Sequence, residues 1–267
     1  MKKYRIIDAH CHIYPDKIAE KAAAATCDFY GGLGSTLDGT VATLSAEAEL
    51  GGIEHCIVQS VATTPKQVSS INNFIAKAVS DSNGKFTGLG TLHPDSEDIK
   101  KDVDEIISLG LKGVKLHPDI QKFKIDDYRM LKIYELCEGR LPILMHTGDN
   151  RYDFSNPNRM MPILDIYKDL TVIGAHFGGW SIWEEATKKL CDYKNFYVDC
   201  SSSLYAITTE KAKELIEMYG ANRVLFGTDY PMWKPKEEIE RFIKIDLTES
   251  QREDIFCNNA ANLFGIH

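Results

Sequence analysis

Short apolar segments alternate with helix-like segments along almost the whole chain of 267 residues. Eight of the apolar segments have the length of strands and little alternation of polar and apolar residues, which is typical of strands buried on both faces. They are residues 4–9, 53–60, 86–92, 111–116, 142–146, 171–176, 196–200 and 223–228. Because helical patterns separate them, they favour one parallel sheet.

Four of the intervening segments carry a clear helical period. They are residues 65–80, 98–110, 126–139 and 208–220. In the first of them Val68, Ile71 and Ile75 fall three or four positions apart, which places them on one helix face. The other three end at a glycine, a common helix stop.

This alternation predicts an α/β fold, a (β/α)8 TIM barrel, as a single domain over residues 1–267. The chain is close to the roughly 250 residues typical of that fold. A doubly wound open sheet is the alternative, although no Gly-x-Gly-x-x-Gly follows the first strand.

Charge and composition exclude several partners. The formal net charge is −8 and no basic run occurs, which argues against a nucleic-acid partner. No stretch approaches the roughly 18 apolar residues of a membrane-spanning helix, so no membrane is expected either. The seven cysteines are scattered, without a Cys-x-x-Cys pair, and predict reduced thiols in a cytoplasmic protein.

Two histidines stand close together at the end of the first predicted strand. His10 and His12 are two positions apart, so on a strand they point to the same face. Residues so placed lie about 6 to 7 Å apart along the strand. That spacing predicts a pair of imidazoles that hold one metal ion.

Further polar residues fall at the carboxyl ends of other predicted strands. They are Lys115, His117, His146, His176 and Asp229. In a parallel barrel these ends share one face, which is the catalytic face. Imidazole nitrogens with a carboxylate oxygen suit Zn²⁺ or another divalent transition metal. The sequence therefore predicts a metal site at the carboxyl ends of the strands. Asp199 and Cys200, which also end a strand, are predicted to make polar core contacts.

Several motifs together resemble the amidohydrolase superfamily, in its amidohydrolase-related branch with aminocarboxymuconate-semialdehyde decarboxylase-like proteins. They are Asp8-Ala9-His10-Cys11-His12, Gly113-Val114-Lys115-Leu116-His117-Pro118, Met145-His146-Thr147-Gly148, Ala175-His176-Phe177-Gly178-Gly179 and Phe226-Gly227-Thr228-Asp229-Tyr230-Pro231. The resemblance covers nearly the whole chain. It is specific for the superfamily and much less so for the substrate.

The resemblance assigns roles to five of these residues. His10, His12, His146 and Asp229 match metal ligands, and Asp229 also matches the residue that accepts a proton from the bound water. His176 matches a residue that acts on water or substrate, or binds a second metal ion. The resemblance leaves open whether the site binds one metal ion or two. Zn²⁺ is the first expectation for the metal.

Four further residues are candidates for the second ion or for the substrate. Lys115 matches a position where some relatives have a carboxylated lysine, and His117 shares its face. Lys115 could instead bind a substrate carboxylate, or lie at the barrel rim. Arg151, in the polar loop 148–160, could bind a carboxylate bidentately. Trp180 could form a wall for an apolar or planar substrate.

These features predict an enzyme that acts on a small molecule. The compact chain favours a hydrolase of an ester, lactone or amide that uses a metal-activated water, with catalytic residues Asp229 and His176. The alternative is a non-oxidative decarboxylase of a small unsaturated or aromatic acid. A barrel with only a structural metal is disfavoured, because structural zinc sites are closed and often rich in cysteine. The resemblance also implies a homodimer.

Overall fold

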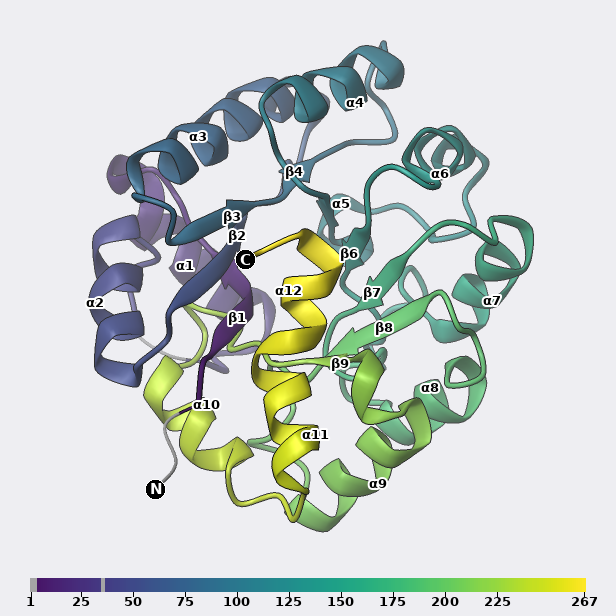
Figure 1. Cartoon of the computed structure of the whole chain (residues 1–267). Coiled ribbons are helices and arrows are strands. Elements are labelled where there is room, and N and C mark those ends of the chain that lie inside the picture. Colours follow the sequence, from purple (N-terminus) through teal and green to yellow (C-terminus); the bar gives the residue numbers. More distant parts are fainter. Residues whose placement is uncertain (1–3, 35–36) are drawn as a thin grey trace.

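The computed structural model describes residues 4–34 and 37–267, and it shows a closed barrel of parallel strands ringed by helices (Figure 1). The strands are β1 (Ile7–His12), β2 (His55–Gln59), β3 (Phe86–Gly88), β4 (Gly90–Thr91), β5 (Val114–Leu116), β6 (Ile143–Met145), β7 (Val172–Gly174), β8 (Phe196–Asp199) and β9 (Val224–Leu225). The backbone N–H of Ala9 donates to the carbonyl of Phe226 at 2.8 Å, and that of His12 to Tyr230 at 2.7 Å. These bonds join the last strand to the first, so the predicted barrel is confirmed and the open sheet is excluded.

One predicted strand, residues 86–92, is divided at Leu89 into β3 and β4. The N–H of Leu89 donates to the carbonyl of Val58 in β2, whereas the next N–H, of Gly90, donates to Gly113 beside β5; both bonds are 2.9 Å long. The segment thus changes its hydrogen-bonding neighbour within one residue. Eight predicted strands therefore correspond to nine observed ones.

Helices cover the outside of the barrel. They are α1 (Asp16–Phe29), α2 (Val41–Gly51), α3 (Val68–Asp81), α4 (Ile99–Ser108), α5 (Pro118–Gln121), α6 (Leu131–Cys137), α7 (Pro157–Ile166), α8 (Trp183–Leu190), α9 (Thr209–Tyr219), α10 (Pro235–Phe242), α11 (Glu249–Glu253) and α12 (Asn259–Phe264), with the short 3₁₀ turns η1 (Pro65–Gln67), η2 (Tyr128–Met130) and η3 (Ala221–Arg223) and the π-helical turn η4 (Asp254–Asn258). Within the described residues, none of these helices is both long and apolar enough to cross a membrane.

Local capping explains where the predicted helices begin. The side chain of Asp98 accepts from Lys101 N–H at 3.0 Å and starts α4. Thr208 starts α9 in the same way. The predicted helices at 65–80 and 126–139 each open with a 3₁₀ turn, η1 and η2. The predicted loop 148–160 ends early, because Pro157 begins α7 and proline suits the first helical position.

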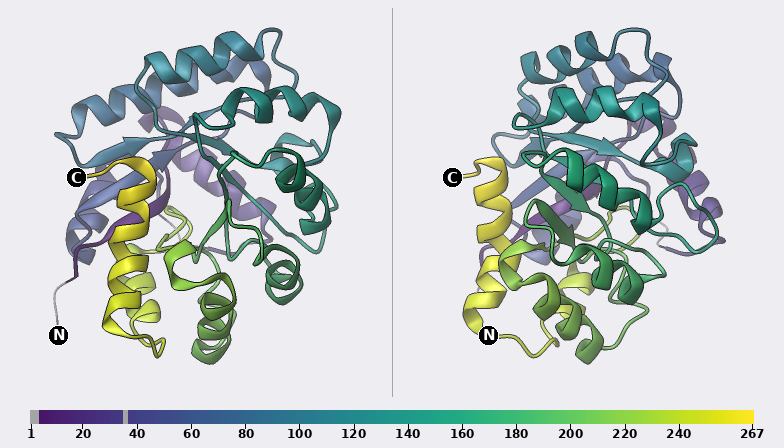
Figure 2. Two further views of the ribbon diagram at one scale, coloured as in Figure 1. Left: turned by 45° about the vertical axis from the view of Figure 1, so that its right-hand side comes forward. Right: turned by 90° about the vertical axis from the view of Figure 1, so that its right-hand side faces the viewer.

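The two ends of the barrel differ in what covers them. At the amino end, the interior side chains Ile7, Leu144 and Ile173 form an apolar cluster with Ala260 and Phe264 of α12. Figure 1 shows α12 lying across this end, and Figure 2 shows α1 at the opposite end. The amino end is therefore sealed by apolar packing, which leaves the carboxyl end for a site.

Candidate active site

A β-bulge in β1 turns His10 and His12 into the carboxyl end of the barrel. From Asp8 to Cys11, three residue steps along β1 match two steps along β2. Ala9 packs in the barrel interior, and the extra residue lets His10 and His12 face the interior as well, although an unbroken strand would alternate. The sequence predicted that the two histidines share a face, but it gave no sign of the bulge that aims them.

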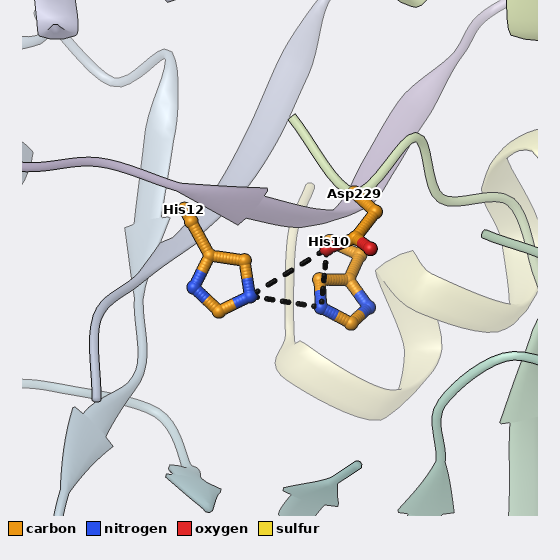
Figure 3. A group of neighbouring side chains, drawn as sticks. All are labelled: His10, His12 and Asp229. Atoms are coloured by element: carbon orange, nitrogen blue, oxygen red, sulfur yellow. Dashed lines mark hydrogen bonds and ion pairs between the residues drawn. The ribbon is translucent and has the colours of Figure 1, made fainter. Parts of the chain in front are cut away.

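Asp229 lies beside the two histidines at the seam where the last strand joins β1 (Figure 3). Nε2 of His10 lies 3.2 Å from Nε2 of His12, and Oδ1 of Asp229 lies 3.3 Å from the first and 3.6 Å from the second. Asp8 joins the two segments, since its carboxylate accepts from the backbone N–H of Thr228 at 2.9 Å and from the Thr228 hydroxyl at 2.5 Å. Asp229 itself has a φ of 60°, a conformation rare outside glycine and frequent at functional sites.

These three side chains, the metal trio of His10, His12 and Asp229, fit a divalent transition metal. Ligands about 2.0 to 2.2 Å from a tetrahedral ion lie about 3.3 to 3.6 Å from one another, close to the separations seen here. Burial holds the pKa of both histidines well below the ordinary value, so each ring is neutral and offers a lone pair.

Asp199, at the end of β8, sets which nitrogen of His10 faces the metal trio. Its Oδ2 accepts from Nδ1 of His10 at 2.8 Å, which leaves the lone pair on Nε2. Its Oδ1 accepts from the Ser201 hydroxyl at 2.5 Å and from the backbone N–H of His176 at 3.1 Å. A carboxylate behind a histidine ligand is a common support of metal sites. Asp199 was predicted to make a polar core contact, and the structure shows that it also orients His10 in the metal trio. Its position at the end of a strand was the feature of the sequence that could have indicated this role.

His146 does not join the metal trio among the residues that the structure describes. Its Nδ1 lies 3.1 Å from Nε2 of His176, and its Nε2 lies 3.6 Å from Oδ2 of Asp119. Its ring stacks on His117 with centroids 4.0 Å apart. The donor atoms of His117, Asp119 and His146 form a second compact group, in which all three residues are buried. The structure therefore brings three of the four predicted ligands together and places the fourth beside His176.

His117 has a partner on each ring nitrogen. Nδ1 accepts from the backbone N–H of Ile120 at 3.3 Å and caps α5. The proton then resides on Nε2, which donates to the Tyr30 hydroxyl at 2.9 Å. This pairing supplies a structural use for His117, which was predicted for a second metal or the substrate. Tyr30 follows α1, and no sequence motif marks it.

Lys115 lies inside the site. Its side chain is 1% exposed, and its Nζ lies 3.0 Å from Nε2 of His10, so the predicted alternative of a rim position is wrong. Burial lowers its pKa to about 8, against the attraction of Asp229 and Asp199. Its ammonium group donates to the same lone pair that a metal would use. Metal binding and this hydrogen bond therefore exclude one another.

Burial also sets the proton affinity of the two predicted catalytic residues. It raises the pKa of Asp229 to about 7, although Ser202 donates to the carboxylate and Lys115 attracts it. It lowers the pKa of His176 to about 3, and the Nδ1 of that ring lies 3.0 Å from both the carbonyl and the hydroxyl of Ser201. Near neutral pH, Asp229 is therefore a group that gains and loses a proton, whereas His176 is neutral.

Arg151 is held by protein groups on the outer side of the site. Its guanidinium donates to both carboxylate oxygens of Asp149, at 2.9 and 2.7 Å, and to the carbonyl of Phe29 at 2.7 Å. It lies 5.2 Å from the ring centre of Tyr30 and 5.4 Å from that of Trp180. Arg151 does not line the cavity above the metal trio. The structure thus gives it a use that differs from the predicted binding of substrate: it ties Tyr30 and Trp180 together.

A cavity of about 450 Å³ opens above the metal trio. The polar side chains at its floor are His10, His12, Lys115, His117, His146, His176 and Asp229. Its other walls come chiefly from α1 and α3. Trp180 contributes to a smaller adjoining hollow, together with Tyr30 and Trp233. The metal trio therefore faces the cavity.

The chain belongs to the amidohydrolase family, whose sequence profile, described as Amidohydrolase, matches residues 7–266. A curated relative, the 2-amino-3-carboxymuconate-6-semialdehyde decarboxylase of Dictyostelium discoideum, is 24% identical over 243 aligned residues. That match covers 73% of this chain and 66% of the relative. The chain spans less than two thirds of the length of the curated relatives it matches.

Solved structures share the fold over nearly the full chain. An uncharacterised TIM-barrel protein of Bordetella bronchiseptica superposes with a TM-score of 0.82 at 24% identity, covering 98% of each chain. A dihydroxybenzoic acid decarboxylase of Polaromonas, with bound manganese and the inhibitor 2-nitroresorcinol, superposes with a TM-score of 0.77 at 20% identity, covering 98% of this chain and 97% of that one. At these identities the likeness establishes the fold, which is the predicted barrel.

Proposed function

We propose that the protein is a metal-dependent, non-oxidative decarboxylase of a small aromatic or unsaturated carboxylic acid. The observation that carries the proposal is the metal trio at the floor of the cavity with the cation Lys115 beside it. A carboxylate is the group that both would attract. The curated relative and the manganese-containing neighbour, both named as decarboxylases, support the same reaction.

Each residue has a task in this reaction. His10, His12 and Asp229 would hold the divalent ion, which supplies a Lewis acid that binds and orients oxygen atoms of the acid. Lys115 would pair with the negative charge of the substrate. The carbon–carbon bond to the carboxyl group breaks, CO₂ leaves, and a proton takes its place on the carbon. Asp229, whose carboxylate lies at the floor of the same cavity, is the group we assign to hold that proton.

His176 and Tyr30 would orient the substrate. The ring of His176 stays neutral, Ser201 fixes its orientation, and it lines the cavity with its Nε2 3.1 Å from Nδ1 of His146. The Tyr30 hydroxyl lies 3.5 Å from both nitrogens of His146 and lines the same cavity. Both groups form hydrogen bonds without adding charge.

Hydrolysis of an ester, lactone or amide, which the sequence favoured, has less support. The same metal trio would serve it, but the relatives with named activities compared above are decarboxylases. The donors do not select one metal ion, because nitrogen and oxygen ligands suit Mn²⁺ as well as Zn²⁺.

A substrate panel separates the two reactions. Metal-free protein would be loaded with Zn²⁺ or Mn²⁺ and given aromatic acids such as 2,6-dihydroxybenzoate, with CO₂ release measured, and esters, lactones and amides in parallel. We expect CO₂ release that requires added metal. Metal-dependent hydrolysis of the neutral substrates, without CO₂ release from any acid, would contradict the proposal.

A further inference from the structure

The cavity above the metal trio has two unlike halves. The floor carries the polar side chains of the barrel, whereas the far walls come from helices that flank the carboxyl end. The volume of about 450 Å³ falls in the usual range for pockets of drug-sized ligands, roughly 300 to 1,000 Å³. The cavity thus has room beyond the metal trio, and the side chains there indicate what fills it.

One wall is a stripe of apolar side chains on α1. Ile18, Ala22, Ala25 and Phe29 all line the cavity and follow one another at steps of four, three and four residues. That spacing is one face of a helix. Only Ala19 is fully buried in α1, and Ile18 is 48% exposed at the outer end of the stripe. This apolar face therefore lies against the cavity rather than in the protein core.

The facing wall is also apolar. Ile71 and Phe74 of α3 and Ile120 of α5 line it. Two polar groups nearby already have partners: Oε1 of Gln67 accepts from Thr63 N–H at 2.8 Å, and the Ser70 hydroxyl donates to the Gln67 carbonyl at 3.0 Å. Neither side chain carries a charge that could pair with a carboxylate of a ligand.

Charge is confined to the floor. Among the described residues that line the cavity, Lys115 is the one Lys or Arg side chain. Arg151 lies outside and is paired with Asp149. A second carboxylate on a ligand, placed between α1 and α3, would lie among apolar side chains with no cation to pair with, which is costly.

We propose that the substrate is a monocarboxylic acid whose carboxyl group lies at the metal trio and Lys115, and whose apolar substituent extends between α1 and α3. This inference rests on the proposed function for the position of the carboxyl group. It adds that a second carboxyl group on the distal side is rejected and that alkyl or aryl groups there are favoured.

Binding of three unreactive acids to the metal-loaded protein, measured by calorimetry, tests the inference. The probes are benzoate, 4-butylbenzoate and terephthalate. Each buried methylene strengthens binding by up to about fourfold, from a transfer free energy near 0.8 kcal/mol. We therefore expect 4-butylbenzoate to bind at least tenfold more tightly than benzoate, and terephthalate to bind more weakly than benzoate.

A matched pair of variants locates the effect. Ala22→Phe fills the space beside the stripe, so it should abolish the advantage of 4-butylbenzoate over benzoate. Ala24→Phe adds the same side chain to an exposed position of α1 that does not line the cavity, and it should change neither affinity. Circular dichroism would check that both variants keep the wild-type fold.

Two results would overturn the inference: terephthalate that binds as tightly as 4-butylbenzoate, or an alkyl advantage that survives in Ala22→Phe. Because none of the probes needs to react, these results are independent of CO₂ release. Failure of every acid to release CO₂ would instead contradict the decarboxylase proposal and leave the measured binding preference as it stands.

Discussion

The two ends of the barrel use the same chain segments for opposite purposes. Ile7 and Ile173 pack in the apolar cluster at the amino end, under Phe264 of α12. Three residues further along the same segments, His10 and His176 lie at the carboxyl end among buried polar groups. One end buries apolar surface, which stabilises the fold. The other holds neutral imidazoles and carboxylates in place for a ligand. Substitutions at the two ends should therefore have separable effects.

The largest effect should come from the carboxyl end. Asp229→Asn keeps the size of the side chain but removes the charge that holds the metal and the proton that we assign to the product carbon. We expect turnover to fall on the order of 10²- to 10⁴-fold, with thermal unfolding of the metal-free protein little changed. Retention of wild-type turnover would show that Asp229 does not transfer the proton.

At the amino end, Leu144→Ala should lower the free energy of unfolding by about 2 to 5 kcal/mol, because it leaves a cavity in the interior cluster. Denaturant unfolding would measure this. Metal affinity of the folded protein should stay within about twofold of wild type. Leu50→Ala, at a position 70% exposed, is the control and should cost less than about 0.5 kcal/mol. A large loss of metal affinity in Leu144→Ala would break the separation between the two ends.

A smaller effect, on metal affinity, is expected from Asp199, which contacts His10 of the metal trio. Asp199→Asn removes the carboxylate that accepts from Nδ1 of His10. Loss of such a partner typically costs about 10- to 100-fold in metal affinity. Competition with a coloured chelator would measure it, and Asp192→Asn, on the segment before β8, is a matched control. Equal affinities in the two variants would remove Asp199 from the site.

The smallest effect concerns Tyr30. Tyr30→Phe keeps the ring and removes the hydroxyl that pairs with Nε2 of His117 at 2.9 Å. A hydrogen bond of this kind contributes about 0.5 to 1.5 kcal/mol, so we expect kcat/KM to fall about 2- to 10-fold. Metal content should be unchanged. A fall beyond a hundredfold would instead assign Tyr30 a direct part in the reaction.

The sequence predicted the barrel and most of its polar carboxyl end, because strand runs and polar strand ends are local signals. Lys115, His146, His176 and Asp229 were all found from their positions at strand ends. What escaped prediction depends on contacts between distant segments. The bulge in β1 appears only in its pairing with β2.

Tyr30 and Arg151, which lie outside the strands and helices, show the same limit of sequence-based prediction. Tyr30 reaches His117 from a segment 87 residues away. Arg151 looked available for a carboxylate, yet its partner is Asp149, two residues before it. Nothing in the sequence tells whether a loop arginine is paired within its own loop, because that depends on how the loop folds over α1.

The assignment of the metal to His10, His12 and Asp229 underlies the proposed function. Crystals loaded with Mn²⁺, with diffraction recorded for anomalous scattering from manganese, would locate the ion directly. We predict one peak about 2.0 to 2.3 Å from Nε2 of His10, Nε2 of His12 and a carboxylate oxygen of Asp229. A peak among His117, Asp119 and His146 instead, or no peak at either group, would contradict the account.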